Sequence, residues 1–230
     1  MIDLTRIHSE ALSTDPYRWA HIDDLFGPSD ATALAASYPD RGFKTLVGSD
    51  GEKGWEYEVR SLIHMGAGEP SHSETLSREW QELAGDLVSP GYREAMGRLT
   101  GHDLSEAPIE VNVFHYGPGA WMGPHKDLED KIVTHVLYFN AEWDAKSGGC
   151  LAILRSSDMS DVKAEIPPVV GNSAVLVRSD DSWHAVSRVV DGSESSRRSV
   201  TVTFYKPGSV STMWPPGEEP ALHPYPPASS

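Results

Sequence analysis

The sequence of 230 residues contains a single cysteine, Cys150, so no disulfide can form within the chain. Disulfides are typical of oxidising compartments, and a chain without them fits a reducing cytoplasm. The first residues lack the basic and apolar segments of a secretory signal, so we expect no signal peptide. No apolar run approaches the ~18 residues that a membrane-spanning helix needs, so the sequence predicts no membrane partner.

Basic residues are also scarce. Lys and Arg number 19 against 34 Asp and Glu, which gives a net charge of −15. A field of this sign disfavours nucleic acid and anionic membranes as partners, and an anionic small molecule would need a local Arg or Lys. The chain has no internal repeats. Its length and its hydrophobic content of 39% fit one compact domain with a substantial core.

Residues 1–108 have mixed character, with helix prominent. The pattern predicts a short strand at 21–26 and helices at 31–38, 73–87 and 92–99. Ser29 or Asp30 would cap the first of these helices, and Gly101 would close the last. The polar, glycine-rich stretch 42–54 predicts a loop, which is either a connector or a lid over a nearby site.

From about residue 109 the pattern becomes strand-like. Five segments are rich in β-branched and aromatic residues, and Gly/Pro turns separate them: 109–116, 132–140, 150–154, 174–177 and 199–205. Many short strands of this kind predict a sandwich or a barrel. We therefore expect a mainly β core at 109–206, with region 1–108 packed on it. The proline-rich tail 207–230 is expected to be extended or partly disordered.

A candidate metal site follows from His125 and Asp127. Residues i and i+2 of a strand point to one face, so this pair can bind one side of a metal ion. His184 is the best candidate for a third ligand. Two histidines and one carboxylate form the facial triad of non-haem Fe(II) oxygenases. Each residue alone also fits a solvated strand end or a structural histidine, and it is the combination that favours metal.

A candidate anion site lies at Arg197 and Arg198, which open the last strand. Arg can bind a carboxylate of a dicarboxylate co-substrate through two parallel hydrogen bonds. Alternation places Arg197 on a polar face with Ser199, Thr201 and Thr203, and it places Arg198 on a largely apolar face. We therefore favour Arg197, although both could be solvated charges at a strand start.

Other polar residues of the strands are candidates for the same pocket. Tyr138 could present its hydroxyl to the far carboxylate of the co-substrate. Asn112 and Tyr116 could contact the near end of the co-substrate or the substrate. His115 falls on the opposite face and is not expected to bind metal. Further candidates for a substrate pocket, each of which could instead be a packing or surface residue, are Trp55, Tyr57, Arg60, His64, Trp121 and Met122.

These residues resemble the Fe(II)/2-oxoglutarate-dependent oxygenase superfamily, prolyl-hydroxylase-like branch, whose members carry H-x-D, a distal His and a basic residue after it. The run 133–151, with its Tyr-x-Asn, Trp-Asp and Gly-Gly elements, looks like the matching stretch of the oxygen-sensing prolyl hydroxylases. The resemblance implies that His125, Asp127 and His184 hold the iron. It also implies that Tyr138 and Arg197 bind the distal carboxylate of 2-oxoglutarate, and that Thr201 and Leu151 line its pocket.

The fold and activity that the resemblance implies are those of a dioxygenase. The fold would be a double-stranded β-helix, a cupin-like jelly roll with supporting helices. The cofactors would be Fe(II), 2-oxoglutarate and O2, and the products would include succinate and CO2. Because Asp127 is present, hydroxylation is favoured over halogenation. Desaturation, epimerisation and cyclisation remain open on the same iron.

The substrate class is less constrained. We expect a small molecule, such as an amino acid, a peptide-like compound or another natural-product intermediate. A prolyl or other protein side chain is the alternative within the class, and a non-enzymatic, metal-binding cupin-like module is the alternative outside it. The segment between His184 and Arg197 is longer than in the oxygen sensors, so their protein substrate does not carry over. A homodimer is left open.

Overall fold

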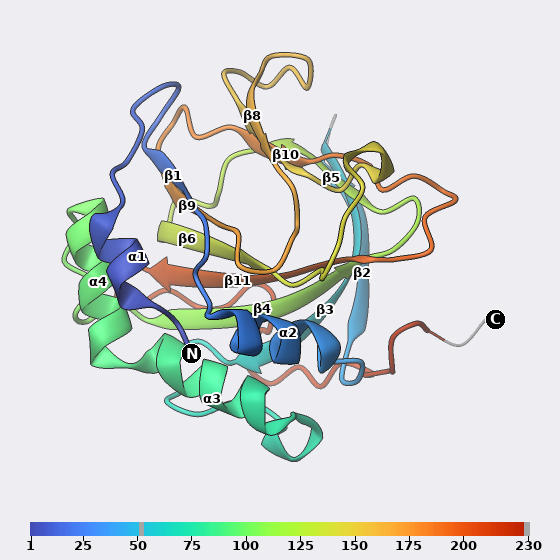
Figure 1. The fold of residues 1–230 in the computed structure, drawn as a ribbon, viewed down its shortest axis with the longest axis horizontal. Helices are drawn as coiled ribbons and strands as arrows, with labels where there is room; N and C mark the ends of the chain where they lie inside the picture. The colour runs from blue at the N-terminus through green and yellow to red at the C-terminus, as the bar shows by residue number, and fades with distance from the viewer. Residues whose placement is uncertain (51–52, 228–230) are drawn as a thin grey trace.

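The computed structural model describes residues 1–50 and 53–227 (Figure 1). Within them, eleven strands form one strongly curved sheet. The strands are β1 Trp19–Ile22, β2 Lys44–Asp50, β3 Lys53–Ile63, β4 Ile109–Tyr116, β5 Trp121–His125, β6 Lys131–Tyr138, β7 Leu151–Leu154, β8 Val162–Ile166, β9 Ser173–Val177, β10 His184–Val186 and β11 Arg197–Tyr205. The helices are α1 Leu4–Ser9, α2 Pro28–Ala36, α3 Arg78–Val88 and α4 Pro90–Thr100, with short 3-10 turns at Ser73–Thr75 and Ala145–Ser147.

The sheet curves around an interior, and its strand order is β1-β9-β6-β11-β4-β3-β5-β10-β7-β8, with β2 paired to β3. Figure 1 shows β10 and β8 across the interior from β6 and β11, with the four helices outside on the other face of the long strands. Neighbouring strands pair antiparallel throughout the described sheet. This is the double-stranded β-helix with supporting helices, so the fold prediction is confirmed.

Strands β4, β6 and β11 are buried on both faces. Their outward side chains are mostly apolar and pack in one core with α3 and α4, as Val113, Val200 and Phe204 illustrate. Their inward side chains are more polar and line a cavity. Alternation explains this division, because successive side chains of a strand point to opposite faces. Burial of this helix-facing layer stabilises the fold by about 25 cal/mol per Å2 of apolar surface removed from water.

The two long helices have ordinary capping signals. Ser77 caps α3 and Ser89 caps α4 by accepting hydrogen bonds from the Trp80 and Tyr92 amides. Gly101, with φ +69°, closes α4 as predicted. In contrast, α2 begins at Pro28 after Gly27 and has no side-chain cap, so the predicted Ser29 or Asp30 cap is wrong. None of the helices in the described chain is long and apolar enough to cross a bilayer.

The stretch 42–54 was expected to be a loop, and this is wrong for the residues that the structure describes. Strands β2 and β3 form a hairpin whose β3 also pairs with β4 and β5. Residues 51–52, part of the proposed connector or lid, lie outside the described residues. The polar composition misled because β3, with which β2 pairs, is held in the sheet by the distant strands β4 and β5, which a local pattern does not reveal.

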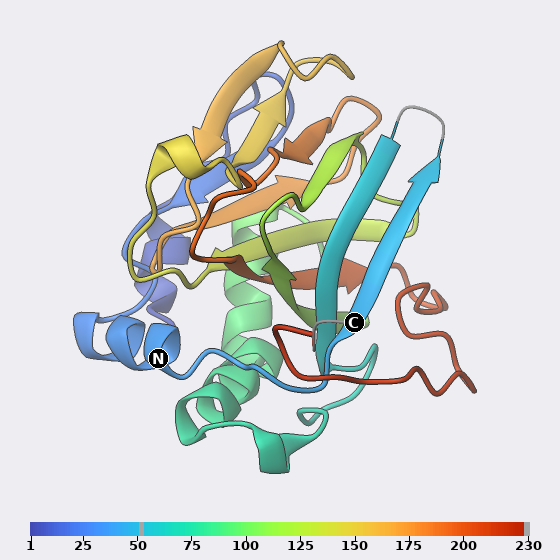
Figure 2. The ribbon, with the colours of Figure 1, turned by 90° about the vertical axis from the view of Figure 1, so that its right-hand side faces the viewer.

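The tail after β11 is extended, as predicted, but it is packed rather than disordered over 207–227. It lies on the same side of the molecule as the β2–β3 hairpin (Figure 2). Phe43 forms a backbone bridge with His223, and the Tyr225 ring stacks on His115 with centroids 3.7 Å apart. The Trp214 indole donates to Asn112 in the cavity at 2.7 Å. The tail therefore forms part of the wall around the site.

Candidate metal and co-substrate site

The three predicted metal ligands meet at one edge of the cavity. His125 is the last residue of β5 and His184 the first of β10, and these two residues are paired across the strands. Asp127 lies two residues beyond the end of β5. One potential ligand atom from each of the three residues lies within 4.8 Å of the others. Asp127 therefore does not share a strand face with His125, so that prediction is wrong, although the three side chains do converge.

Both histidines are oriented by backbone carbonyls. His125 Nδ1 lies 2.9 Å from the Gly123 oxygen, and His184 Nδ1 lies 3.0 Å from the Ser182 oxygen. A carbonyl oxygen accepts a hydrogen bond, so each Nδ1 carries the proton and each Nε2 carries the lone pair that a metal needs. Such outer hydrogen bonds are typical of metal-binding histidines, because they fix the tautomer and the ring orientation.

Strand β6 fixes Asp127 although this residue lies outside a strand. Lys131 Nζ donates to Asp127 Oδ1, and Thr134 Oγ1 donates to Oδ2, both at 2.8 Å. Burial by itself raises the pKa of Asp127, but the Lys131 charge and the neighbouring His184 and His125 outweigh it and hold this pKa well below its usual range. A carboxylate that stays ionised is the form that coordinates a metal.

The cavity beside the three ligands has a volume of about 440 Å3 and extends along the inner faces of β4, β6 and β11. Arg197 lies at its far end. The guanidinium, 2% exposed as a residue, lies over the rings of Tyr116 at 4.8 Å and Tyr138 at 5.4 Å. Its Nη1 donates to Ser199 Oγ at 2.6 Å. The cavity therefore has metal-ligand chemistry on one side and a buried cation at one end.

Buried polar atoms at this end fit a bound carboxylate. Within the described residues, no hydrogen bond of good geometry reaches Arg197 Nε or the Tyr138 hydroxyl. Buried polar groups are rarely left unsatisfied, because each costs about 1–3 kcal/mol. Burial raises the pKa of Tyr138, so its hydroxyl remains a donor at neutral pH. The two groups together suit the distal carboxylate of 2-oxoglutarate.

Arg198 points out of the cavity. Its Nη1 donates to the Ala35 oxygen at 3.3 Å, and its guanidinium lies 5.5 Å from the centre of the Tyr38 ring. This is the outcome of strand alternation, which places neighbouring residues on opposite faces. The same rule puts His115 outside, where its Nδ1 lies 2.7 Å from Ser196 Oγ and its ring stacks on Tyr225.

The remaining co-substrate candidates line the same cavity: Leu151, Ser199, Thr201, Asn112 and Tyr116. The substrate candidates divide. Trp55, Tyr57 and Met122 line the cavity, whereas Arg60, His64 and Trp121 do not. His64 instead contacts Ser61 and lies edge-on to Trp214.

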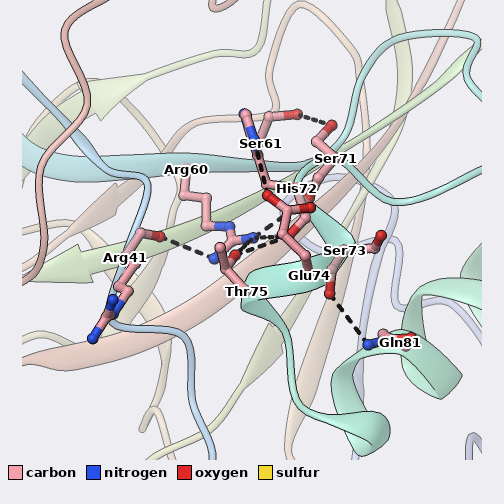
Figure 3. Close-up of polar contacts among 9 residues, drawn as sticks. All are labelled: Arg41, Arg60, Ser61, Ser71, His72, Ser73, Glu74, Thr75 and Gln81. Carbon is pink, nitrogen blue, oxygen red and sulfur yellow. Dashed lines mark hydrogen bonds and ion pairs between the residues drawn. The ribbon is translucent and has the colours of Figure 1, made fainter.

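Arg60 has a structural role in place of the predicted one. Figure 3 shows its guanidinium directed to the segment that leads into α3. Nη1 donates to the Arg41 oxygen at 2.9 Å, and Nη2 donates to Thr75 Oγ1 at 2.8 Å and to nearby carbonyls. Arg60 therefore ties β3 to the preceding and following loops and is not a pocket residue.

Sequence reasoning missed several residues at the other end of the cavity. Lys131 and Thr134 hold Asp127, and Glu110 and Tyr205 line the wall beside them. Alternation along β4 places Glu110 on the face of Asn112, so the sequence does contain a signal for this residue. Met213 and Trp214 come from the tail, and nothing in their local sequence indicates that they return to the cavity.

Comparison with known proteins agrees with this geometry. Residues 111–205 match the model of the 2OG-Fe(II) oxygenase superfamily. Among curated proteins, no sequence matches the chain. The matched segment contains the three candidate ligands, Tyr138 and Arg197.

Solved structures with the same fold include enzymes of different kinds. A Pseudomonas putida prolyl-4-hydroxylase has 20% identity and a TM-score of 0.57, with 82% of this chain and 92% of that chain covered. A Trichoplax adhaerens prolyl hydroxylase, solved with a hypoxia inducible factor peptide, has 15% identity and a TM-score of 0.51, covering 89% and 88%. The non-heme alpha ketoglutarate dependent epimerase SnoN from nogalamycin biosynthesis has 10% identity and a TM-score of 0.50, covering 99% and 94%. At these identities the likeness concerns the fold alone.

Proposed function

We propose, from the premise that residues 111–205 belong to the 2OG-Fe(II) oxygenase superfamily, that this protein hydroxylates an unactivated C–H bond of a small molecule. The observation that supports the proposal best is the pairing of two features in one cavity. Three convergent ligands, His125, Asp127 and His184, lie at its edge, and the buried Arg197 lies at its end. A metal-binding module without catalysis would not require the second feature.

The residues take separate roles in this proposal. His125, Asp127 and His184 would hold Fe(II), with Gly123 and Ser182 fixing the histidine tautomers and Lys131 and Thr134 the carboxylate. Arg197 and Tyr138 would bind the distal carboxylate of 2-oxoglutarate, with Ser199 holding the guanidinium in place. Preorganised side chains of this kind reduce the entropic cost of orienting the co-substrate.

The bound iron, with 2-oxoglutarate and O2, would supply the oxidising power for the C–H bond and release succinate and CO2. The chain itself provides a carboxylate ligand, an enclosed cavity and a fixed orientation. Since Asp127 occupies the carboxylate position, hydroxylation is favoured over halogenation.

A small-molecule substrate is favoured by the way the cavity is enclosed. Leu46, Trp55 and Tyr57 of the hairpin and Met213 of the tail contribute to its wall. This leaves about 440 Å3, a volume typical of small-ligand sites. The second candidate is a prolyl or other protein side chain. A surface hollow beside the ligands, lined by Lys126, Met159 and Trp183 among others, favours it because it offers room for a peptide.

Anaerobic titration with Fe(II) and 2-oxoglutarate tests the oxygenase function. We expect the weak visible charge-transfer band of the iron–2-oxoglutarate chelate in the wild type and its loss in His184→Ala. His64→Ala, which changes a histidine outside the cavity, is the matched control and should keep the band. Folded wild-type protein that binds metal but gives no band would contradict the proposal. Candidate substrates can then be screened by the shift that they cause in this band.

A further inference from the structure

A buried carboxylate lies at the end of the cavity opposite to Arg197. Glu110, 1% exposed, is on the inner face of β4. Its Oε2 accepts hydrogen bonds from Asn112 Nδ2 and the Tyr205 hydroxyl, each at 3.2 Å. Its Oε1 is buried and, within the described residues, has no hydrogen-bond partner. A buried charge normally requires a partner, so this oxygen is available to a ligand in the cavity.

Cations near Glu110 are already engaged elsewhere. Lys131 Nζ pairs with Asp127. Lys44 Nζ donates to the Met213 carbonyl and lies 4.1 Å from the centre of the Trp214 ring. No ion pair of Glu110 occurs among the residues that the structure describes. Within the described residues the carboxylate therefore makes no close ion pair, and Lys44 interacts with its charge only at longer range.

The carboxylate is close to the candidate metal ligands but separate from the Arg197 end. Across the sheet, Glu110 on β4 pairs with Thr203 on β11, and Thr203 pairs with Thr134 on β6, which donates to Asp127. Neighbouring strands are about 4.8 Å apart, so Glu110 lies roughly 10 Å from Thr134 along this row. A group bound at Glu110 would thus hold carbons a few bonds away in front of the metal ligands.

We propose that Glu110 determines substrate specificity by binding a cationic nitrogen, so that the substrate is a small aliphatic amine or guanidine. The inference rests on the proposed function and names its substrate class. The two ends of the cavity then have opposite preferences: Arg197 binds the anionic co-substrate, and Glu110 binds the cationic substrate. The net charge of −15 favours the approach of such a cation.

Ligand-observed NMR on Zn(II)- and 2-oxoglutarate-loaded protein tests the inference with four probes of similar size: butylamine, butylguanidine, butan-1-ol and butyrate. We expect the two cations to bind more tightly than the alcohol and the acid, and to lose at least tenfold in affinity in Glu110→Gln. That variant keeps an acceptor oxygen for Tyr205 while removing the charge. Glu165→Gln, which removes an exposed carboxylate outside the cavity, should bind the probes like the wild type.

Equal affinity of the cations for wild type and Glu110→Gln, or a wild type that does not prefer them over butan-1-ol, would overturn the inference. The iron–2-oxoglutarate band, recorded on the same proteins, separates this failure from failure of the proposed function. A band in wild type and Glu110→Gln without cation preference leaves the oxygenase standing and removes only the role of Glu110. Absence of the band in the wild type removes the proposed function.

Discussion

Two parts of the molecule contribute to the same cavity in different ways. One part is strands β4, β6 and β11, and the other is the β2–β3 hairpin together with the tail. The three strands carry Tyr138 and Arg197 on regular inner faces, in a sheet buried on both sides. The hairpin contributes Trp55 and Tyr57 and the tail contributes Met213, while Trp214 of the tail donates a hydrogen bond to Asn112. Regular strands thus carry the candidates for co-substrate binding and Glu110, whereas contacts between distant segments bring the remaining wall residues to the cavity.

The largest expected effect concerns the metal ligands. Asp127→Ala should abolish 2-oxoglutarate turnover, since it removes a charged ligand and leaves Lys131 without its partner. Thr134→Val removes only the hydrogen bond to Asp127 and should cost roughly 10–100-fold in iron affinity. Measurements of iron affinity and of succinate formation test both variants. Full activity of Asp127→Ala would remove this residue from the ligand set.

The next prediction compares substitutions of the two arginines of β11 by their effect on the 2-oxoglutarate requirement. Arg197→Ala should raise the 2-oxoglutarate concentration required for half-maximal turnover by roughly 100-fold, because a buried charge-assisted hydrogen bond contributes about 3 kcal/mol. Arg198→Ala loses a hydrogen bond to the Ala35 carbonyl on the helix side and should leave that concentration within about twofold. Titration of 2-oxoglutarate against succinate formation distinguishes them, and the reverse order of effects would show that the inward face is assigned wrongly.

A smaller effect is expected in the tail. Trp214→Ala removes the hydrogen bond to Asn112 and the contact with Lys44, so local opening of the tail should become about tenfold more frequent. Trp214→Phe keeps an aromatic ring for Lys44, so its rate of local opening should lie between those of the wild type and Trp214→Ala. The rate of limited proteolysis after residue 206, followed by mass spectrometry, measures the opening. An unchanged rate together with an unchanged chelate band would mean that Trp214 does not hold the tail in place.

The same division explains what could be predicted from the sequence. Periodicity located β4, β6 and β11 to within two residues, and alternation alone separated Arg197 from Arg198 and excluded His115. Asp127 converged with His125 for a different reason than a shared strand, because Thr134 and Lys131 hold it from β6. The hairpin at 44–63 and the insertion of Trp214 depend on contacts between distant segments, and Arg60 faces loops that only the folded chain brings together.

The last prediction concerns the pH dependence of stability and compares two buried histidines on the outward face. Burial lowers the pKa of both His115, beneath the tail, and His135, beneath α4, to about 3, with the nearby Arg198 adding to the effect at His115. An unfolded histidine has a pKa of about 6.5, so below that pH the unfolded chain binds more protons than the folded one. Stability contributed by the neutral form is therefore complete above pH 6.5 and declines as the pH falls towards 3.

Each of these histidines should steepen the decline by up to about 1.4 kcal/mol per pH unit. Urea unfolding at pH 7, 6, 5 and 4 should show a shallower slope in His115→Gln and in His135→Gln than in wild type, whatever stability each variant has at pH 7. Carboxylates contribute equally to all three slopes and cancel in the comparison. The slope could be reduced in His135→Gln but unchanged in His115→Gln. This result would mean that the tail opens before global unfolding and lets His115 titrate in the folded core. It would sharpen the distinction between the regular strands and the wall formed around them.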